Sequence, residues 1–454
     1  MTDTPYAPVV VLRMPNWLGD AIMALPALDL LAREIPQAAI VVSCRPNLMD
    51  LFRSHPSVWG IIPAPKHGIP GLVKCCRPYR MIEPTEEPIP HTNRETHSEG
   101  KTIMRRIPVP LALRFTKINT GGSFDAGALF PNSLSSAVWL WKIGAKHRVG
   151  YNRNARGLFL NKRIPITNST LDRHLTEYYL TIADETVTVL SSESSRWPSF
   201  PPQAIEGLAK PSFFSAADLA DMPRDPVIGI PIPILSIPAR GEKEATFLMR
   251  EAGMMNGDEN VTEAKMAKHL RILTIAPMSA YGAIKDWPSH YYTELVKRYT
   301  AGGWHVFVTG SESQWSVCAE IASVSPNAVN VAGRTTLAGL LALIKRSDLF
   351  IGGDSGAAHA AAALGIRTVA IYGVTEPART RQLGLHVRIV GVHEERFKAA
   401  LNHEVPTSKI SARLETNDSL DSPKMAALAK ELLEGIAVDR VVEAAQELRR
   451  PPSE

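Results

Sequence analysis

The chain has 454 residues, 45% of them apolar, and a formal net charge of +5 at pH 7. This length exceeds one ordinary domain, and the apolar content is enough for full hydrophobic cores, which excludes a disordered chain and predicts two globular domains. The modest positive charge is compatible with anionic substrates or an anionic membrane surface, and we expect no nucleic-acid partner.

Cysteine usage and hydropathy predict a cytoplasmic protein. The four cysteines are scattered and form no CxxC pair, which favours a reduced compartment over a disulfide framework or a zinc site. No apolar run reaches the ~18–20 residues that a membrane-spanning helix needs. The N-terminus also lacks the basic stretch that opens a secretory signal.

The first part of the chain alternates short apolar runs with helical patterns. Runs this apolar are typical of a parallel sheet covered on both faces. We expect strands at Val9–Met14, Ala39–Ser43, Trp59–Pro63 and Phe124–Phe130, and helices at Ala21–Arg33, Pro46–Phe52 and Ser133–Ile143. These elements predict a Rossmann-like domain over residues 1–200.

The alternation returns more clearly in a second domain, over residues 269–422. Strands are expected at Ile272–Ala276, His305–Thr309, Ala328–Val331, Leu349–Gly352 and Thr368–Tyr372, and helices at Ser289–Thr300, Ser313–Ala322, Thr336–Lys345 and Gly356–Leu364. This order implies right-handed crossovers and a doubly wound sheet. The predicted fold class is therefore α/β, with two Rossmann-like doubly wound domains facing a cleft.

Other stretches fit neither domain. Residues 66–122 are rich in proline and basic side chains and predict an insertion that is extended or partly disordered. Residues 201–268 are expected to be an extended linker, within which Pro226–Pro238 has too many prolines for a central strand. Asn402–Asp421 predicts a loop, and residues 423–454 end the chain in one or two amphipathic helices.

The first candidate site is the loop RMPNWLGD between the first strand and helix. Loops at the carboxyl ends of strands face the ligand crevice of an open α/β sheet. Asn16, Trp17 and Gly19 would form an acceptor-side loop, in which Gly19 lets the backbone approach a substrate closely. Asp20 is the candidate general base for an acceptor hydroxyl. The alternative is that Asp20 only caps the helix.

The second candidate site opens the second domain with APMSA and IKDWP. Lys285 would lie near strand ends, where a cation can hold a diphosphate, and Ser279 could donate to the same group. The alternative for Lys285 is a solvated surface lysine.

The third candidate site is GGDSGAAH, where a strand runs into a helix of small residues. Amides at the start of this helix, at Ser355 and Gly356, would face an anion, and the helix dipole would favour it. Asp354 is expected to cap the helix or order the loop rather than contact phosphate. His359 lies one turn into the helix, with a structural histidine as the alternative.

Two further strand ends carry polar candidates. Glu312 could accept hydrogen bonds from a donor ribose or sugar, or could cap a helix. Thr375 could line the nucleotide site, or could belong to an ordinary turn.

Familiar competing motifs are absent from the sequence. It has no GxGxxG after the first strand, no GxxxxGK[ST], no HExxH, no metal-spaced His/Cys cluster and no DxD motif. We therefore expect a reaction that needs no metal and no cofactor.

These motifs resemble a known family in order and spacing. RMPNWLGDAIMALPAL, FDAGALFPNSLSSAVWLWKIGAKHRVGY, KDWP, VTGSE, VAGRTTL and GDSGAAH are similar to segments of glycosyltransferase family 9, the ADP-heptose:lipopolysaccharide heptosyltransferases. The first segment resembles the family's heptosyltransferase II branch. The resemblance covers roughly residues 8–65, 123–180 and 270–392.

The resemblance implies a GT-B architecture, with acceptor bound by the first domain and donor by the second. It implies heptose transfer from ADP-heptose to the lipopolysaccharide inner core, with inversion at the anomeric carbon. By the same resemblance, Asp20 is the catalytic base, Lys285 binds phosphate and Glu312 contacts the nucleotide. The diphosphate loop corresponds to Asp354, Ser355, Gly356 and His359.

Other readings stay open at this point. They are a GT-B enzyme with another nucleotide-sugar donor, a sugar-nucleotide epimerase on the same plan, and a non-catalytic nucleotide-sugar or lipid-binding protein. The 66–122 insertion departs from the family; it could touch the anionic inner face of the inner membrane or have no function.

Overall fold

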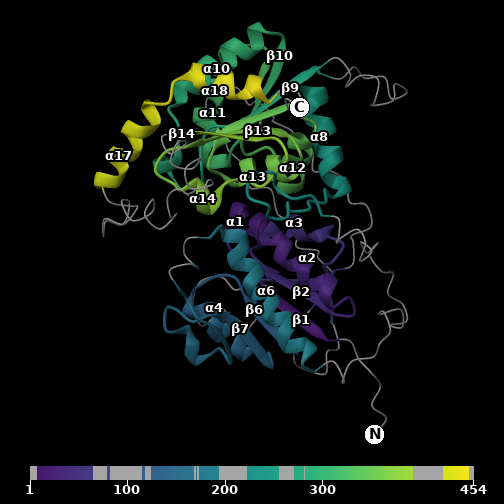
Figure 1. The fold of residues 1–454 in the computed structure, drawn as a ribbon. Helices are drawn as coiled ribbons and strands as arrows, with labels where there is room; N and C mark the ends of the chain where they lie inside the picture. The colour runs from purple at the N-terminus through teal and green to yellow at the C-terminus, as the bar shows by residue number, and fades with distance from the viewer. Residues whose placement is uncertain are drawn as a thin grey trace, which may run out of the picture.

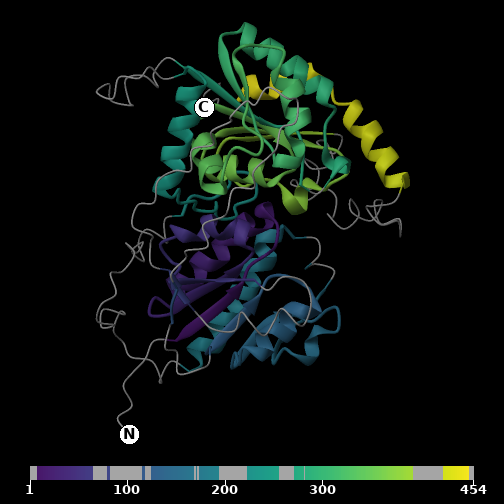
Figure 2. The ribbon, with the colours of Figure 1, turned by 180° about the vertical axis from the view of Figure 1, so that it is seen from behind.

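The computed structural model describes residues 8–64, 79–81, 115–117, 124–167, 170, 173–193, 222–254, 270–280, 282–391 and 423–448. These residues form two α/β units stacked end to end (Figure 1). Each unit contains one six-stranded parallel sheet with helices packed against it (Figure 2). The predicted insertion lies largely outside the described residues, and residues 402–421 lie wholly outside them.

The sheet of the first unit has the strand order β3-β2-β1-β6-β7-β8, and every neighbouring pair is parallel. Its strands are β1 (Val9–Arg13), β2 (Ala39–Cys44), β3 (Gly60–Pro63), β6 (Ala126–Leu129), β7 (His147–Tyr151) and β8 (Lys162–Ile164). The sequence predicted the first four and missed β7 and β8. A separate antiparallel pair joins β4 (Tyr79–Met81) to β5 (Phe115–Lys117).

Helices cover this sheet, and α2 packs along α6. They are α1 (Leu18–Met23), α2 (Leu25–Glu34), α3 (Met49–Arg53), α4 (Leu134–Lys142) and α6 (Leu175–Ser191), with short 3₁₀ turns η1 (Pro46–Leu48) and η3 (Arg156–Leu158). The single helix expected at Ala21–Arg33 is wrong in two respects. It begins earlier, at Leu18, and it is interrupted at Ala24 because Pro26 has no N–H to continue the hydrogen-bond ladder.

The sheet of the second unit repeats the same order, β11-β10-β9-β12-β13-β14. Its strands are β9 (Arg271–Ala276), β10 (Trp304–Val308), β11 (Ala328–Asn330), β12 (Leu349–Gly353), β13 (Arg367–Tyr372) and β14 (Val387–Gly391). Its helical elements are α8 (Ala239–Glu251), η5 (Ala283–Lys285), α10 (Ser289–Ala301), η6 (Glu312–Gln314), α11 (Trp315–Ala322), α12 (Leu337–Lys345), α13 (Gly356–Ala363) and α14 (Pro377–Thr380). The two sheets confirm the predicted doubly wound, Rossmann-like fold of both units.

Two segments outside the predicted domains pack against the second unit. Within residues 201–268, α8 packs along α12, while residues 226–238 join neither sheet. At the end of the chain, α17 (Pro423–Glu434) and α18 (Val438–Glu447) lie on the outer side of this unit (Figure 1), where the indole N–H of Trp287 donates to the Ile436 carbonyl at 3.0 Å. The domain boundaries themselves stay predictions. Among the described residues, no helix has both the length and the apolarity needed to cross a bilayer.

Candidate active site

The loop after β1 is held by a buried arginine. The Arg13 guanidinium donates to the Met14 carbonyl and, at 2.6 Å, to the side-chain oxygen of Asn16. Trp17 occupies the N-cap position of α1 without a side-chain cap, and the Arg45 guanidinium lies 5.7 Å from the centroid of its exposed ring. Asn16 and Trp17 are therefore fixed at the carboxyl edge of the first sheet.

Asp20 lies in the first turn of α1, inside the helix. The alternative that it is the N-cap is wrong, because Trp17 occupies that position. Burial raises the pKa of Asp20 to about 6; the charge of Lys285 opposes this shift and that of Asp354 adds to it. Because Lys285 and Asp354 belong to the second unit, Asp20 faces across the interface between the units.

Lys285 and Asp354 form a largely buried ion pair at the facing edge of the second unit. Lys285 Nζ lies 2.6 Å from Asp354 Oδ2, with side chains 18% and 4% exposed. The Tyr372 hydroxyl donates to the other carboxylate oxygen at 3.3 Å. Gly353 permits this arrangement, because a Cβ there would lie 2.9 Å from the Lys285 carbonyl oxygen. The alternative of a solvated surface lysine is therefore wrong.

The helix that follows is capped by Ser355 and not by Asp354. Ser355 Oγ accepts from the Ala358 amide at 3.4 Å, so the expectation that Asp354 caps α13 is wrong. The carboxylate of Asp354 faces Lys285 because that pairing compensates its burial. His359, one turn into the helix, places Nε2 3.9 Å from Asp354 Oδ1. Burial lowers the pKa of His359 to about 4, which keeps its ring neutral at pH 7.

Two glycines bring the units into contact. A Cβ added to Gly19 would lie 2.8 Å from Cδ2 of His359, and one added to Gly356 would lie 2.6 Å from Cβ of Leu18. The sequence predicted that Gly19 lets the backbone approach a substrate and that the Gly356 amide faces an anion. In the structure each one makes room for the opposite unit, so that the first turns of α1 and α13 pack together.

Ser279 lies buried just after β9. Its amide donates to Asp286 Oδ1 at 2.6 Å, and its carbonyl accepts from the Gln314 side-chain amide at 3.4 Å. Burial raises the pKa of Asp286 to about 6. Asp286 thus shapes the loop that carries Ser279, a function that the sequence did not single out.

Glu312 and Thr375 lie on the flanking loops. Glu312 is exposed at the start of η6, where Ser311 and Gln314 form the capping box, so its alternative role as a helix cap is wrong. Thr375 is half-buried between β13 and α14, and the Glu376 side chain caps that helix. Donor contacts of both residues stay predictions.

A buried hydrogen bond between His174 and Arg381 joins the two units, and the sequence did not predict it. We call this contact the His174–Arg381 latch. His174 Nδ1 accepts from the Thr176 amide at 3.2 Å, while Nε2 lies 3.0 Å from the Arg381 carbonyl of the other unit. Burial lowers the pKa of His174 to about 3, which matches a neutral ring donating through Nε2. The Arg381 guanidinium in turn lies 2.7 Å from Asp225 Oδ1, and both side chains are buried. A lone histidine and an arginine 207 residues apart give no pairing signal in one sequence.

Within the ranges that the structure describes, no three or more His, Cys, Asp or Glu side chains are grouped so that they could hold a metal ion.

Comparison with known proteins shows a similarity to one family of glycosyltransferases. The sequence model of glycosyltransferase family 9 (heptosyltransferase) matches residues 242–409. Lipopolysaccharide heptosyltransferase 2 of Escherichia coli (strain K12) is 24% identical over 396 residues, covering 84% of this chain and 88% of that protein. Lipooligosaccharide heptosyltransferase 2 of Haemophilus ducreyi is 21% identical and covers 83% and 86%.

Two solved structures share the fold over nearly the whole chain. The ADP-heptose lps heptosyltransferase II of E. coli has a TM-score of 0.60 at 20% identity, covering 97% of this chain and 98% of that one. A family 9 glycosyl transferase from Veillonella parvula has a TM-score of 0.61 at 15% identity, with 98% of both chains covered. The GT-B architecture predicted from the sequence is thereby confirmed. The similarity to the sequence model of glycosyltransferase family 9 extends over residues 242–409, and the likeness of the fold extends over nearly the whole chain.

Proposed function

We propose that this protein transfers a heptose from ADP-heptose to a hydroxyl of the lipopolysaccharide inner core, with inversion at the anomeric carbon. One observation carries the proposal: a carboxylate of raised pKa on the first unit faces a lysine–carboxylate pair on the second. Relatives that span most of the chain are named for heptosyl transfer to lipopolysaccharide. The mechanism that we propose uses the roles that the sequence led us to expect for the site residues.

In this mechanism Asp20 is the general base. With a pKa near 6 it is mostly ionised at pH 7, yet more basic than an ordinary aspartate. It accepts the proton of the acceptor hydroxyl as that oxygen forms a bond to the anomeric carbon, and the bond from that carbon to the ADP oxygen breaks. Attack on the face opposite the leaving group inverts the anomeric centre. Asn16, Trp17 and Gly19 form the acceptor side.

The second unit stabilises the departing ADP. The Lys285 ammonium has three N–H donors, so it can retain Asp354 and still donate to a diphosphate oxygen. The first turn of α13, with Ser355 and Gly356, adds backbone amides and the positive end of the helix dipole. The neutral ring of His359 lies beside Asp354 and adds no charge to the Lys285–Asp354 pair. We assign Ser279, Glu312 and Thr375 to further donor contacts.

We propose that the reaction uses no metal and no other cofactor. Lys285 and the α13 N-terminus together supply the positive charge that a metal would bring to a diphosphate. Transfer should therefore continue unchanged in excess EDTA, and a loss restored by divalent cations would contradict this proposal.

The test is an assay of purified protein with ADP-heptose and a lipid A–core acceptor that lacks this heptose. We expect a product heavier by one heptose and one ADP released for each transfer. GDP- and UDP-sugars serve as controls, and transfer from one of them would replace the donor assignment. Conversion of ADP-heptose without acceptor would instead indicate an epimerase, and ADP binding without any turnover would indicate a binding protein.

A further inference from the structure

Helix α4 exposes an apolar face. Leu134, Val138 and Trp141 repeat at i, i+4 and i+7 and so share one side, while Ala137 and Leu140 on the other side are buried in the core. Leu134 is 42% exposed and Trp141 51% exposed. A surface helix ordinarily has polar residues on its outer side, so this outer side is unusual.

The neighbouring turn η3 extends this apolar surface. Leu158 is 82% exposed, and the Phe159 ring meets the Trp141 ring at 5.8 Å between centroids. The Arg148 guanidinium donates to the carbonyls of Phe159 and Ala145, both at 2.7 Å, which holds η3 against the end of α4. We call the surface formed by Leu134, Val138, Trp141, Leu158 and Phe159 the α4–η3 face. Contiguous apolar surface of this kind marks an interaction site.

The charge around this face has one sign. From Ala126 to Leu171 the sequence contains no aspartate or glutamate. The same stretch contains seven lysines and arginines: Lys142, Lys146, Arg148, Arg153, Arg156, Lys162 and Arg163. Such a stretch repels basic partners and attracts an anionic surface.

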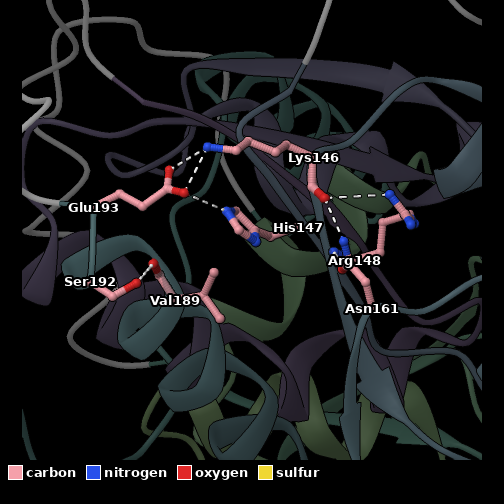
Figure 3. Close-up of polar contacts among 7 residues, drawn as sticks. All are labelled: Lys146, His147, Arg148, Asn161, Val189, Ser192 and Glu193. Atoms are coloured by element: carbon pink, nitrogen blue, oxygen red, sulfur yellow. Dashed lines mark hydrogen bonds and ion pairs between the residues drawn. The ribbon is translucent and has the colours of Figure 1, made fainter.

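The acids of α6 and the residues after it neutralise only one side of this region. Glu193 lies 2.7 Å from Lys146 and 3.1 Å from His147, as Figure 3 shows. Glu185 lies 3.2 Å from Lys162. These contacts lie on the α6 side and leave the other side basic.

Three cations beside the α4–η3 face have no acidic partner among the described residues. Lys142 follows Trp141 on α4 and is exposed. Arg153 lies in the exposed loop that is tied to the start of α4 through Asn154 and the Asn132 carbonyl at 3.1 Å. Arg163 lies next to η3, where its Nε donates to the Leu160 carbonyl at 3.2 Å. These three cations flank an apolar face that ends in a tryptophan.

We propose that the α4–η3 face docks this protein on an anionic lipid bilayer. Tryptophan and leucine side chains enter the boundary between headgroups and acyl chains, and Lys142, Arg153 and Arg163 meet the anionic headgroups. The proposal rests on the proposed function insofar as a lipid-linked acceptor lies in such a surface. The α4–η3 face and the acceptor-side loop both belong to the first unit. In this proposal the membrane contact is made by the folded α4–η3 face. The sequence alone had instead suggested the insertion at residues 66–122 as the segment that could touch the membrane.

Vesicle binding tests this proposal. Purified protein is sedimented with phosphatidylcholine vesicles with and without phosphatidylglycerol, in the absence of donor and acceptor, so the result does not depend on catalysis. We expect binding that requires phosphatidylglycerol and weakens with added salt. The double variant Trp141→Ser, Leu158→Ser should lose binding by about tenfold or more, because each side chain contributes buried apolar area.

A matched control removes two exposed apolar side chains from the second unit. The double variant Phe247→Ser, Leu385→Ser should bind vesicles like the unmodified protein, since those residues are 44% and 51% exposed and lie away from the α4–η3 face. Equal loss in both double variants would overturn the proposal.

Charge reversal tests the basic rim separately. The triple variant Lys142→Glu, Arg153→Glu, Arg163→Glu should lose the preference for phosphatidylglycerol while circular dichroism and transfer to a detergent-solubilised acceptor remain unchanged. Binding that persists in both face variants would overturn the proposal. A dimer of the unmodified protein that becomes a monomer in the Trp141→Ser, Leu158→Ser variant would also overturn it, because a second copy would then cover the face.

Discussion

Two buried carboxylates of the first unit, Asp29 and Asp20, differ in their charged neighbours and in their pKa values. Asp29, on α2, lies 3.4 Å from Nε2 of His55, and neither side chain has any solvent exposure. Asp20, one helix earlier, is also largely desolvated, but its electrostatic neighbours Lys285 and Asp354 come from the other unit. Burial raises the pKa of Asp29 to about 8 and that of Asp20 to about 6.

One cause of this difference in pKa is the cation across the interface, Lys285, which favours the ionised form of Asp20. Without one, Asp29 stays protonated at pH 7, and His55 stays neutral because burial lowers its pKa to about 4. With Lys285 opposing desolvation, Asp20 ionises below pH 7 and can accept a proton. A carboxylate beside a histidine is thus no sign of catalysis by itself; a pKa held near the working pH by a partner in another unit is a better one.

The largest effect that tests this comparison is expected from Asp20→Asn. Loss of the general base should reduce kcat by about 10²–10⁴, while ADP still binds. Asp29→Asn should leave kcat unchanged. Steady-state kinetics and calorimetric titration with ADP measure both quantities. If the two substitutions reduced kcat equally, Asp20 would have no special role.

The next largest effect is expected from Lys285→Ala. Loss of its charge at the departing diphosphate should reduce kcat by about 10²–10³ and weaken ADP binding. Lys297→Ala, which removes an exposed lysine from α10 of the same unit, is the control. Normal turnover by the Lys285 variant would remove this residue from the mechanism.

A smaller effect concerns stability. The raised pKa of Asp29 means that the folded chain retains a proton that the unfolded chain has lost, so this contribution to stability falls as pH rises towards 8. The lowered pKa of His55 makes stability rise with pH, but only below about pH 6.5, which is the pKa of histidine in the unfolded chain. Between pH 6.5 and 8 Asp29 should therefore reduce the free energy of unfolding by roughly 1–2 kcal/mol.

Urea unfolding at these two pH values measures this slope. Asp29→Asn should remove it, since the amide does not titrate. Asp184→Asn, on the exposed side of α6, should retain the slope of the unmodified protein. A slope that survives in the Asp29 variant would assign the proton to another group.

The smallest effect is a shift in the pH dependence of kcat. Transfer should rise with pH through about 6 as Asp20 ionises. Asp354→Asn removes a negative neighbour and should move this rise to lower pH, whereas Lys285→Ala removes a positive one and should move its residual activity to higher pH. Shifts in the same direction for both variants would contradict the electrostatic assignment.

The sequence predicted most strands of the two sheets to within about a residue and missed three strands that carry several basic side chains. β1, β2, β9, β12 and β13 lie within a residue of their expected bounds because their side chains are buried on both faces of a sheet. β7, β8 and β14 were missed because they carry arginines, lysines and a histidine, such as Arg148, Arg163 and Arg388, near or at the edges of the sheets. α8 was missed because its surroundings are rich in proline and charge.

By itself the sequence determined the α/β class, the two repeats of the fold and the loops at Asp20, Lys285 and Asp354, since these depend on local pattern and strand ends. Only the tertiary structure decided which of those groups meet. The Lys285–Asp354 pair spans 69 residues, and the His174–Arg381 latch spans 207. It also decided that Gly19 and Gly356 serve the contact between the units, and that Leu134 and Trp141 of α4 are exposed. Charge pairing and close packing are properties of positions in space, and a single sequence records the residues without recording those positions.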